Sequence, residues 1–135
     1  KYGQNDRVQE AITLNDLGTL YRDMDRYAEA EQVAMRATDI LTAQYGSNHS
    51  FSAAAMANLG QIYARQGRYD QALPIMKEAL TAKEASVGPD HPMVATSLVG
   101  LAEIALQQGQ LDSAETLLER ALSIRKDKLG VETPD

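Results

Sequence analysis

A period of 42 residues runs through this chain and constrains its fold more than any other feature. Such self-similarity is the signature of a repeat architecture, in which each unit buries its apolar face against the next unit. The chain is therefore predicted to contain three copies of one unit, over about residues 7–48, 49–90 and 91–132. Moving the sequence by 42 positions superposes Leu17, Leu59 and Leu101, then Ala30, Ala72 and Ala114, then Ala37, Ala79 and Ala121.

Each unit contains two stretches in which apolar residues recur at helical spacing. Gly67 and Gly109 follow the first stretch, where a left-handed residue ends a helix at little cost and leaves a tight turn. Asp25 occupies the same column, so we expect it to adopt a left-handed conformation as well. The pattern predicts antiparallel pairs of helices over about residues 6–23, 27–44, 50–66, 69–86, 92–108 and 111–128.

Small residues recur where the two helices of a unit are expected to cross. Gly60 lies in the first helix of the second unit and Ala72 lies in the second helix. A glycine inside a helix costs about 1 kcal/mol relative to alanine, so close packing is the expected compensation. We therefore predict that the backbones approach each other at Gly60 and Ala72.

The repeated columns resemble the tetratricopeptide repeat. The resemblance rests on Leu14-Leu17-Gly18-Tyr21 with Ala30 and Ala37, and on Met56-Leu59-Gly60-Tyr63 with Ala72 and Ala79. The third copy departs most, because it has Ala102 in place of the glycine and Ala105 in place of the tyrosine. A 42-residue unit is similar to the longer variety seen in kinesin light chain. This resemblance implies an all-α, right-handed superhelical solenoid built from three units and six helices.

The linkers suggest how the array continues. The segment GPDHP at 88–92 joins the second unit to the third, and GVETP at 130–134 occupies the same columns one unit later. We therefore expect residues 1–135 to form a single array that comes from a longer protein. An apolar outer face is then expected to be left uncovered, which makes association of the array end to end a prediction.

Composition excludes several classes of partner. The net charge is −6 and the isoelectric point is about 4.9, which argues against nucleic acid, because phosphate binding needs a basic stripe. No apolar run is long enough for a membrane span, and an acidic membrane surface would repel the chain. The absence of cysteine excludes disulfides and thiolate metal sites, and it fits a reducing cytoplasm, which is the predicted location.

Neither a metal site nor an active site is predicted. His49 and His91 share one column, but equivalent points in stacked helical layers lie about 10 Å apart, too far to share a metal ion. A cap at the start of a helix is the better role for each imidazole, and Thr133 in the same column fits that role. No phosphate loop, metalloprotease motif or dinucleotide fingerprint is present. We therefore expect no enzyme and no cofactor.

The predicted function is protein binding. In tetratricopeptide proteins the first helices line a concave groove that commonly holds a peptide or a partner helix. The resemblance gives Asn58 the role of holding a ligand backbone, and Arg22 and Arg65 could receive its carboxylates. Two alternatives remain: a structural spacer or self-assembling rod, and a sensor module that regulates a neighbouring domain. The candidate groove residues are Asn15, Thr19, Arg22, Asn58, Gln61, Arg65, Glu103 and Gln107.

Overall fold

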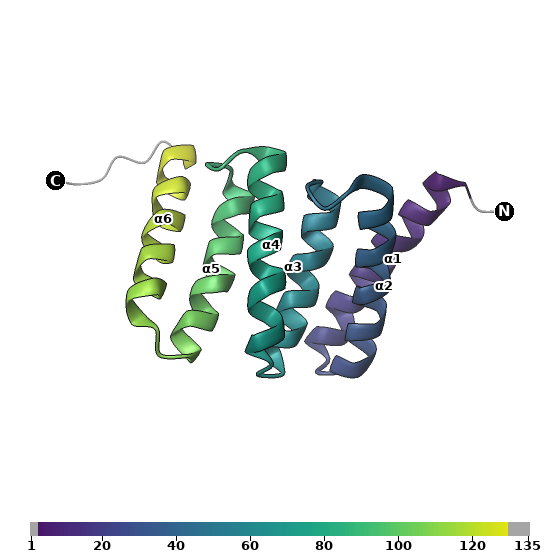
Figure 1. Ribbon diagram of the computed structural model, residues 1–135, viewed down its shortest axis with the longest axis horizontal. Coiled ribbons are helices and arrows are strands. Elements are labelled where there is room, and N and C mark those ends of the chain that lie inside the picture. The colour runs from purple at the N-terminus through teal and green to yellow at the C-terminus, as the bar shows by residue number, and fades with distance from the viewer. Residues whose placement is uncertain (1–2, 130–135) are drawn as a thin grey trace.

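Residues 3–129 fold into six helices that stand side by side in three antiparallel pairs (Figure 1). This computed structural model describes residues 3–129, so GVETP and Thr133 lie outside the described residues. No strand occurs between residues 3 and 129, and the predicted all-α repeat solenoid is confirmed. The helices are α1 (Gln4–Asp23), α2 (Tyr27–Tyr45), α3 (Ser50–Arg65), α4 (Tyr69–Val87), α5 (Pro92–Gln107) and α6 (Leu111–Leu129).

The pairs α1–α2, α3–α4 and α5–α6 are called repeats 1, 2 and 3 below. Each predicted helix end lies within two residues of the observed end, because the apolar periodicity and the turn residues set the same boundaries. The left-handed turn inside each repeat is confirmed, with φ values of 60° at Asp25, 74° at Gly67 and 73° at Gly109. Asp25 is the only one of the three that carries a side chain in this strained region.

Replacing Asp25 by glycine is expected to leave the free energy of unfolding unchanged or to raise it by up to about 1 kcal/mol. Glycine relieves the backbone strain, while the exposed hydrogen bond from the Tyr27 hydroxyl to Asp25 Oδ1 at 2.8 Å is lost. Asp25→Ala is the matched control, because it loses the same hydrogen bond and keeps the strain. Thermal unfolding should rank Asp25→Gly above Asp25→Ala, and the opposite order would show that the left-handed backbone at position 25 holds no strain for glycine to relieve.

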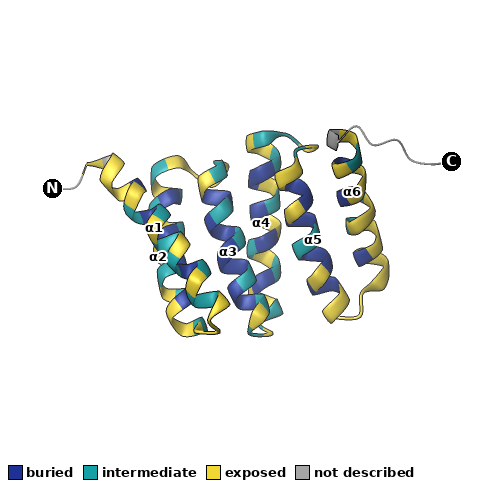
Figure 2. Ribbon diagram, turned by 180° about the vertical axis from the view of Figure 1, so that it is seen from behind, coloured by how far each residue is buried: buried dark blue, intermediate teal, exposed yellow. Residues whose placement is uncertain are grey.

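The core follows the contact between the paired helices, and its residues are concentrated on the middle helices (Figure 2). Ala72 is fully buried beside Leu59 and Tyr63. The reason for Gly60 differs from the prediction, because the atoms nearest to a Cβ added there belong to Met76 and Ile75 and not to Ala72. That Cβ would lie 2.3 Å from Met76 Cγ, so a long side chain on α4 requires the glycine.

A three-residue contact joins repeat 1 to repeat 2. The guanidinium carbon of Arg68 lies 4.7 Å from the centre of the Tyr63 ring, and Nη1 of Arg68 pairs with Glu31 Oε2 at 2.8 Å. Glu31 comes from α2, whereas Tyr63 and Arg68 come from α3 and the turn after it. We call this arrangement the Glu–Arg–Tyr contact. Tyr63 itself is buried in the core, and Arg68 covers the face of its ring.

Repeat 3 lacks that contact. The three columns hold Leu73, Gln110 and Ala105 at the junction of repeats 2 and 3. A hollow of about 470 Å³ remains there, lined by these residues and by Leu101 and Leu117, among others. Loss of the large aromatic side chain leaves space that the neighbouring residues have not closed, as is usual after a large-to-small change.

Filling this hollow should stabilise the protein. Ala105→Phe is expected to raise the free energy of unfolding by about 0.5–2 kcal/mol, because its ring would lie against Leu73, Leu101 and Leu117. Ala102→Phe on the same helix is the control, since Ala102 is fully buried and a ring there would overpack. Urea unfolding should shift in opposite directions for the two variants. A destabilised Ala105→Phe would mean that the hollow closes around the alanine.

Candidate functional site

Two adjoining hollows lie along the first helices of the three repeats. The smaller, of about 210 Å³, is lined by residues of α1, α3, α4 and α5, and the larger, of about 440 Å³, by residues of α3, α4 and α5. Both include Gln61, Met76 and Gly100, so they are two parts of one surface depression. We call it the first-helix groove.

The groove brings together all eight candidate residues from the sequence. They come from three different repeats and meet because equivalent positions on stacked first helices face the same side. The smaller hollow contains Asn15, Thr19, Arg22, Asn58 and Gln61, and the larger contains Gln61, Arg65, Glu103 and Gln107.

Asn58 is buried at the seam between repeats 1 and 2. Its Nδ2 donates to the backbone oxygen of Asn15 at 3.3 Å and to Asn15 Oδ1 at 3.1 Å. Its Oδ1 accepts a hydrogen bond from Arg22 Nη1 at 3.1 Å. The amide that was expected to hold a ligand backbone therefore makes contacts within the protein, and it positions Arg22.

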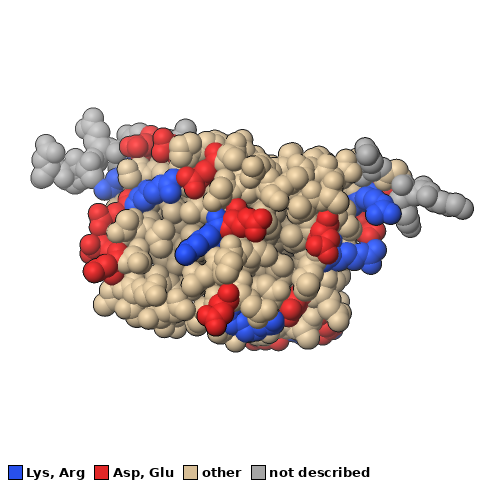
Figure 3. All heavy atoms as spheres, in the orientation of Figure 1, with Lys and Arg blue, Asp and Glu red and all other residues tan. Residues whose placement is uncertain are grey.

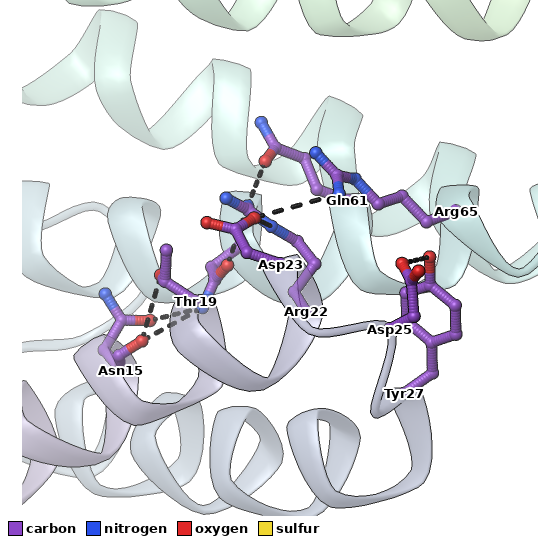
Figure 4. A network of polar contacts seen from close by, with 9 residues as sticks. Asn15, Thr19, Arg22, Asp23, Asp25, Tyr27, Gln61 and Arg65 are labelled. Carbon is purple, nitrogen blue, oxygen red and sulfur yellow. Dashed lines mark hydrogen bonds and ion pairs between the residues drawn. The ribbon is translucent and has the colours of Figure 1, made fainter.

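Arg22 is the most enclosed cation on α1, with 14% of its side chain exposed. Its Nη1 also donates to Gln61 Oε1, and its Nε lies 3.3 Å from Asp23 Oδ1. The same oxygen of Asp23 lies 3.8 Å from Nη1 of Arg65, so one carboxylate joins two cations of neighbouring repeats (Figure 4). The side-chain amides of Asn58 and Gln61, both on α3 of repeat 2, therefore orient Arg22 in the groove, while Asp23 forms an ion pair with its Nε.

Lys83 is a groove residue that the sequence reasoning missed. It lies on α4, lines the smaller hollow and is only 8% exposed. Burial lowers the pKa of its ammonium group, and no ion pair among residues 3–129 involves it. The sequence carried only a weak signal, because the column that holds Lys83 contains Leu41 in repeat 1 and Arg125 in repeat 3. Leu41 is buried, so a cation at the equivalent position of repeat 2 is costly and suggests a specific use.

The smaller hollow therefore has a charge opposite to that of the whole chain. Two cations, Arg22 and Lys83, line it, and no aspartate or glutamate is among its lining residues. Acidic and basic side chains are interspersed over the face seen in Figure 3. The field that a ligand meets in the groove is thus set by these two nearby cations more than by the net charge of −6.

The two histidines cap helices, as predicted. His49 Nδ1 accepts a hydrogen bond from the backbone N–H of Phe51 at 3.1 Å, and His91 Nδ1 accepts one from Met93 at 3.1 Å. Each bond satisfies a donor in the first turn of a first helix. Over residues 3–129, no group of three potential metal ligands comes together.

Comparison with known proteins identifies the family. The chain matches the family model described as the tetratricopeptide repeat over residues 9–85 and again over 52–127. BtubC (BKLC) from P. vanneervenii superposes with a TM-score of 0.80 and 21% identity, over 93% of this chain and 50% of that one. A Podosopora anserina protein described as a kinesin light chain with nearly identical TPR-like repeats superposes with a TM-score of 0.78 and 22% identity. The superposition covers 90% of this chain and 58% of that one.

At these identities the likeness to the two structures shows the fold alone. The chain spans about half the length of those proteins, and no curated protein sequence matches it. That it comes from a longer array stays a prediction. Within the described residues, no helix is both long and apolar enough to cross a membrane.

Residues 3–129 form six helices that superpose on a kinesin-light-chain-like array, and the family model covers residues 9–127. The chain belongs to the tetratricopeptide repeat family.

Proposed function

We propose that the first-helix groove binds an extended segment of a partner protein, with an acidic side chain of that segment placed near Arg22 and Lys83. Tetratricopeptide repeats generally serve as protein-interaction scaffolds, and the family is generally non-catalytic. The observation that carries the proposal is Lys83, a buried cation without an ionic partner among residues 3–129, which lines a hollow free of lining carboxylates. A ligand carboxylate would supply the missing partner charge.

The rest of the groove suits a segment of mixed polarity. Asn15, Thr19 and Gln107 offer amide and hydroxyl groups for a ligand backbone, and Glu103 adds a negative charge to the larger hollow. Cations therefore dominate the smaller hollow, and both signs of charge line the larger one. A bound segment is expected to place its acidic residue toward α1 and to place polar or basic residues toward the end of α5.

The proposal can be tested with a library of fluorescent 12-residue peptides. Each peptide containing Asp or Glu is paired with a copy in which Asn or Gln replaces the acid, and fluorescence polarisation measures binding. We expect acidic members to bind the wild type at least about tenfold more tightly than their amide copies. Equal binding of acidic and amide copies would refute the role of the two cations.

Lys83→Met is the key variant, because it removes the ammonium group and leaves the hydrogen-bond network of Arg22 intact. The preference for acidic peptides should be lost or sharply reduced. Arg36→Met is the matched control: it also removes one positive charge, but Arg36 lies outside both hollows and pairs with Glu10 at 2.8 Å. Equal losses in both variants would point to net charge instead of the groove.

A second candidate function is a self-assembling rod. The exposed apolar side chains of Leu20 on α1 and of Leu118 and Leu122 on α6 favour it.

A further inference from the structure

The outer faces of the array carry the two halves of the Glu–Arg–Tyr contact. On repeat 1, the guanidinium carbon of Arg26 lies 4.7 Å from the centre of the Tyr21 ring, the same distance as between Arg68 and Tyr63. Tyr21 and Arg26 are the column equivalents of that pair. Arg26 pairs with the exposed Glu29, which lies three residues later on α2 of the same repeat. Among residues 3–129, no acidic residue of another repeat forms an ion pair with Arg26.

The acidic half lies on repeat 3. Glu115 on α6 occupies the column of Glu31, and it is exposed. At the internal junction of repeats 2 and 3 the three columns hold Leu73, Gln110 and Ala105, so the contact is absent there. The outer faces of repeats 3 and 1 therefore match each other in charge better than repeats 2 and 3 do.

The apolar residues on these faces match as well. Leu20 on α1 is 54% exposed, although its column holds Ile62 and Ile104, which are buried at the internal junctions. On α6, Leu118 and Leu122 are 39% and 53% exposed. The column of Leu118 contains Ala34, and Ala34 and Ile62 belong to the same buried cluster between α2 and α3. Leu118 and Leu20 are thus the outer equivalents of two residues that share a core.

We infer that two copies of this chain associate head to tail, with α6 of one copy packed against α1 of the next. Glu115 would pair with Arg26 above the Tyr21 ring, and Leu118 would cover Leu20, repeating the junction of repeats 1 and 2. The contact is heterologous, because a different face of each copy takes part, and it adds copies in a line unless the rotation closes a ring. This inference goes beyond the groove and does not depend on what the groove binds.

Sedimentation velocity over a range of protein concentration tests the inference. The average mass of the wild type should rise with concentration beyond that of one copy. Glu115→Arg and Arg26→Glu should each weaken association at least about tenfold, because each places like charges at the junction. Circular dichroism should show that both variants keep their helices.

The decisive measurement is an equal mixture of the two variants. Every junction between unlike variants then joins opposite charges, so alternating copies should associate and the average mass should return toward the wild-type level. Glu78→Arg is the control for net charge, because Glu78 is exposed on α4 in the middle repeat. A wild type that stays a single copy, or a mixture that stays as weak as its parts, would overturn the inference. Lys83→Met should associate like the wild type, which separates this result from that of the groove.

Discussion

Replacing Gly60 by alanine lowers the stability of this protein, although alanine is the better helix former. Overpacking a core costs about 1–3 kcal/mol, and the gain in helix propensity returns about 1 kcal/mol. The added Cβ would lie 2.3 Å from Met76 Cγ and 3.2 Å from Ile75 Cγ2, and neither atom is the free end of a flexible chain. We therefore expect a net loss of up to about 2 kcal/mol in the free energy of unfolding, measured by urea denaturation.

Gly100→Ala provides the matched comparison. Its added Cβ would meet only the terminal methyl carbon of Met76, at 2.9 Å, which can move away. This variant should be neutral or more stable by up to about 1 kcal/mol. Combining Gly60→Ala with Met76→Ala should make the alanine at 60 favourable, because the obstructing atoms are gone. If both glycine variants stabilise the protein, the close approach at Gly60 is not what limits the packing.

Replacing Lys83 by methionine is expected to stabilise the fold while removing the preference for acidic peptides. Methionine keeps an unbranched side chain and removes the ammonium group of a residue that is 8% exposed and has no ionic partner among residues 3–129, so the gain should be up to about 2 kcal/mol at neutral pH. A buried cation that costs stability and lines a surface hollow is a candidate for a functional site.

The stability gained by Lys83→Met should decrease as the pH rises. Burial lowers the pKa of Lys83 in the folded state below its ordinary value of 10.5, so the unfolded chain binds this proton more tightly. Stability of the wild type therefore rises as the pH passes from the lowered pKa toward 10.5, relative to the variant. Urea unfolding of both proteins at neutral and at alkaline pH measures the difference. A difference that grows with pH would contradict the assignment of a buried ammonium.

Most of the fold could be predicted because it depends on local patterns that repeat three times. Helix ends, the left-handed Asp25 and the caps at His49 and His91 are each set by one or two residues beside the turn. The partner of Gly60 could not be predicted in this way. Met76 and Ala72 both lie on the apolar face of α4, and only the rotation of that helix decides which of them covers the glycine.

The candidate site was predictable in its position but only partly in its chemistry. Column positions placed eight residues in one groove, because stacking keeps equivalent residues on the same side. Which side chains contact one another depends on the offset between neighbouring repeats. That offset brings Asn58 against Asn15 and Arg22, and it directs Lys83 from a second helix into the groove. A single column does not contain this information.

The missing aromatic ring at Ala105 has a mechanical consequence for the whole array. Repeats 1 and 2 are joined by the ion pair of Arg68 with Glu31 above the Tyr63 ring. Between repeats 2 and 3 a hollow remains, and an ion pair joins Arg120 and Glu84 at the surface, 2.9 Å apart. In a linear array each unit is held only by its neighbours, so the weakest seam sets where the array first comes apart. Repeat 3 should therefore detach or swivel before the other two separate, and the curvature of the array should change at that seam.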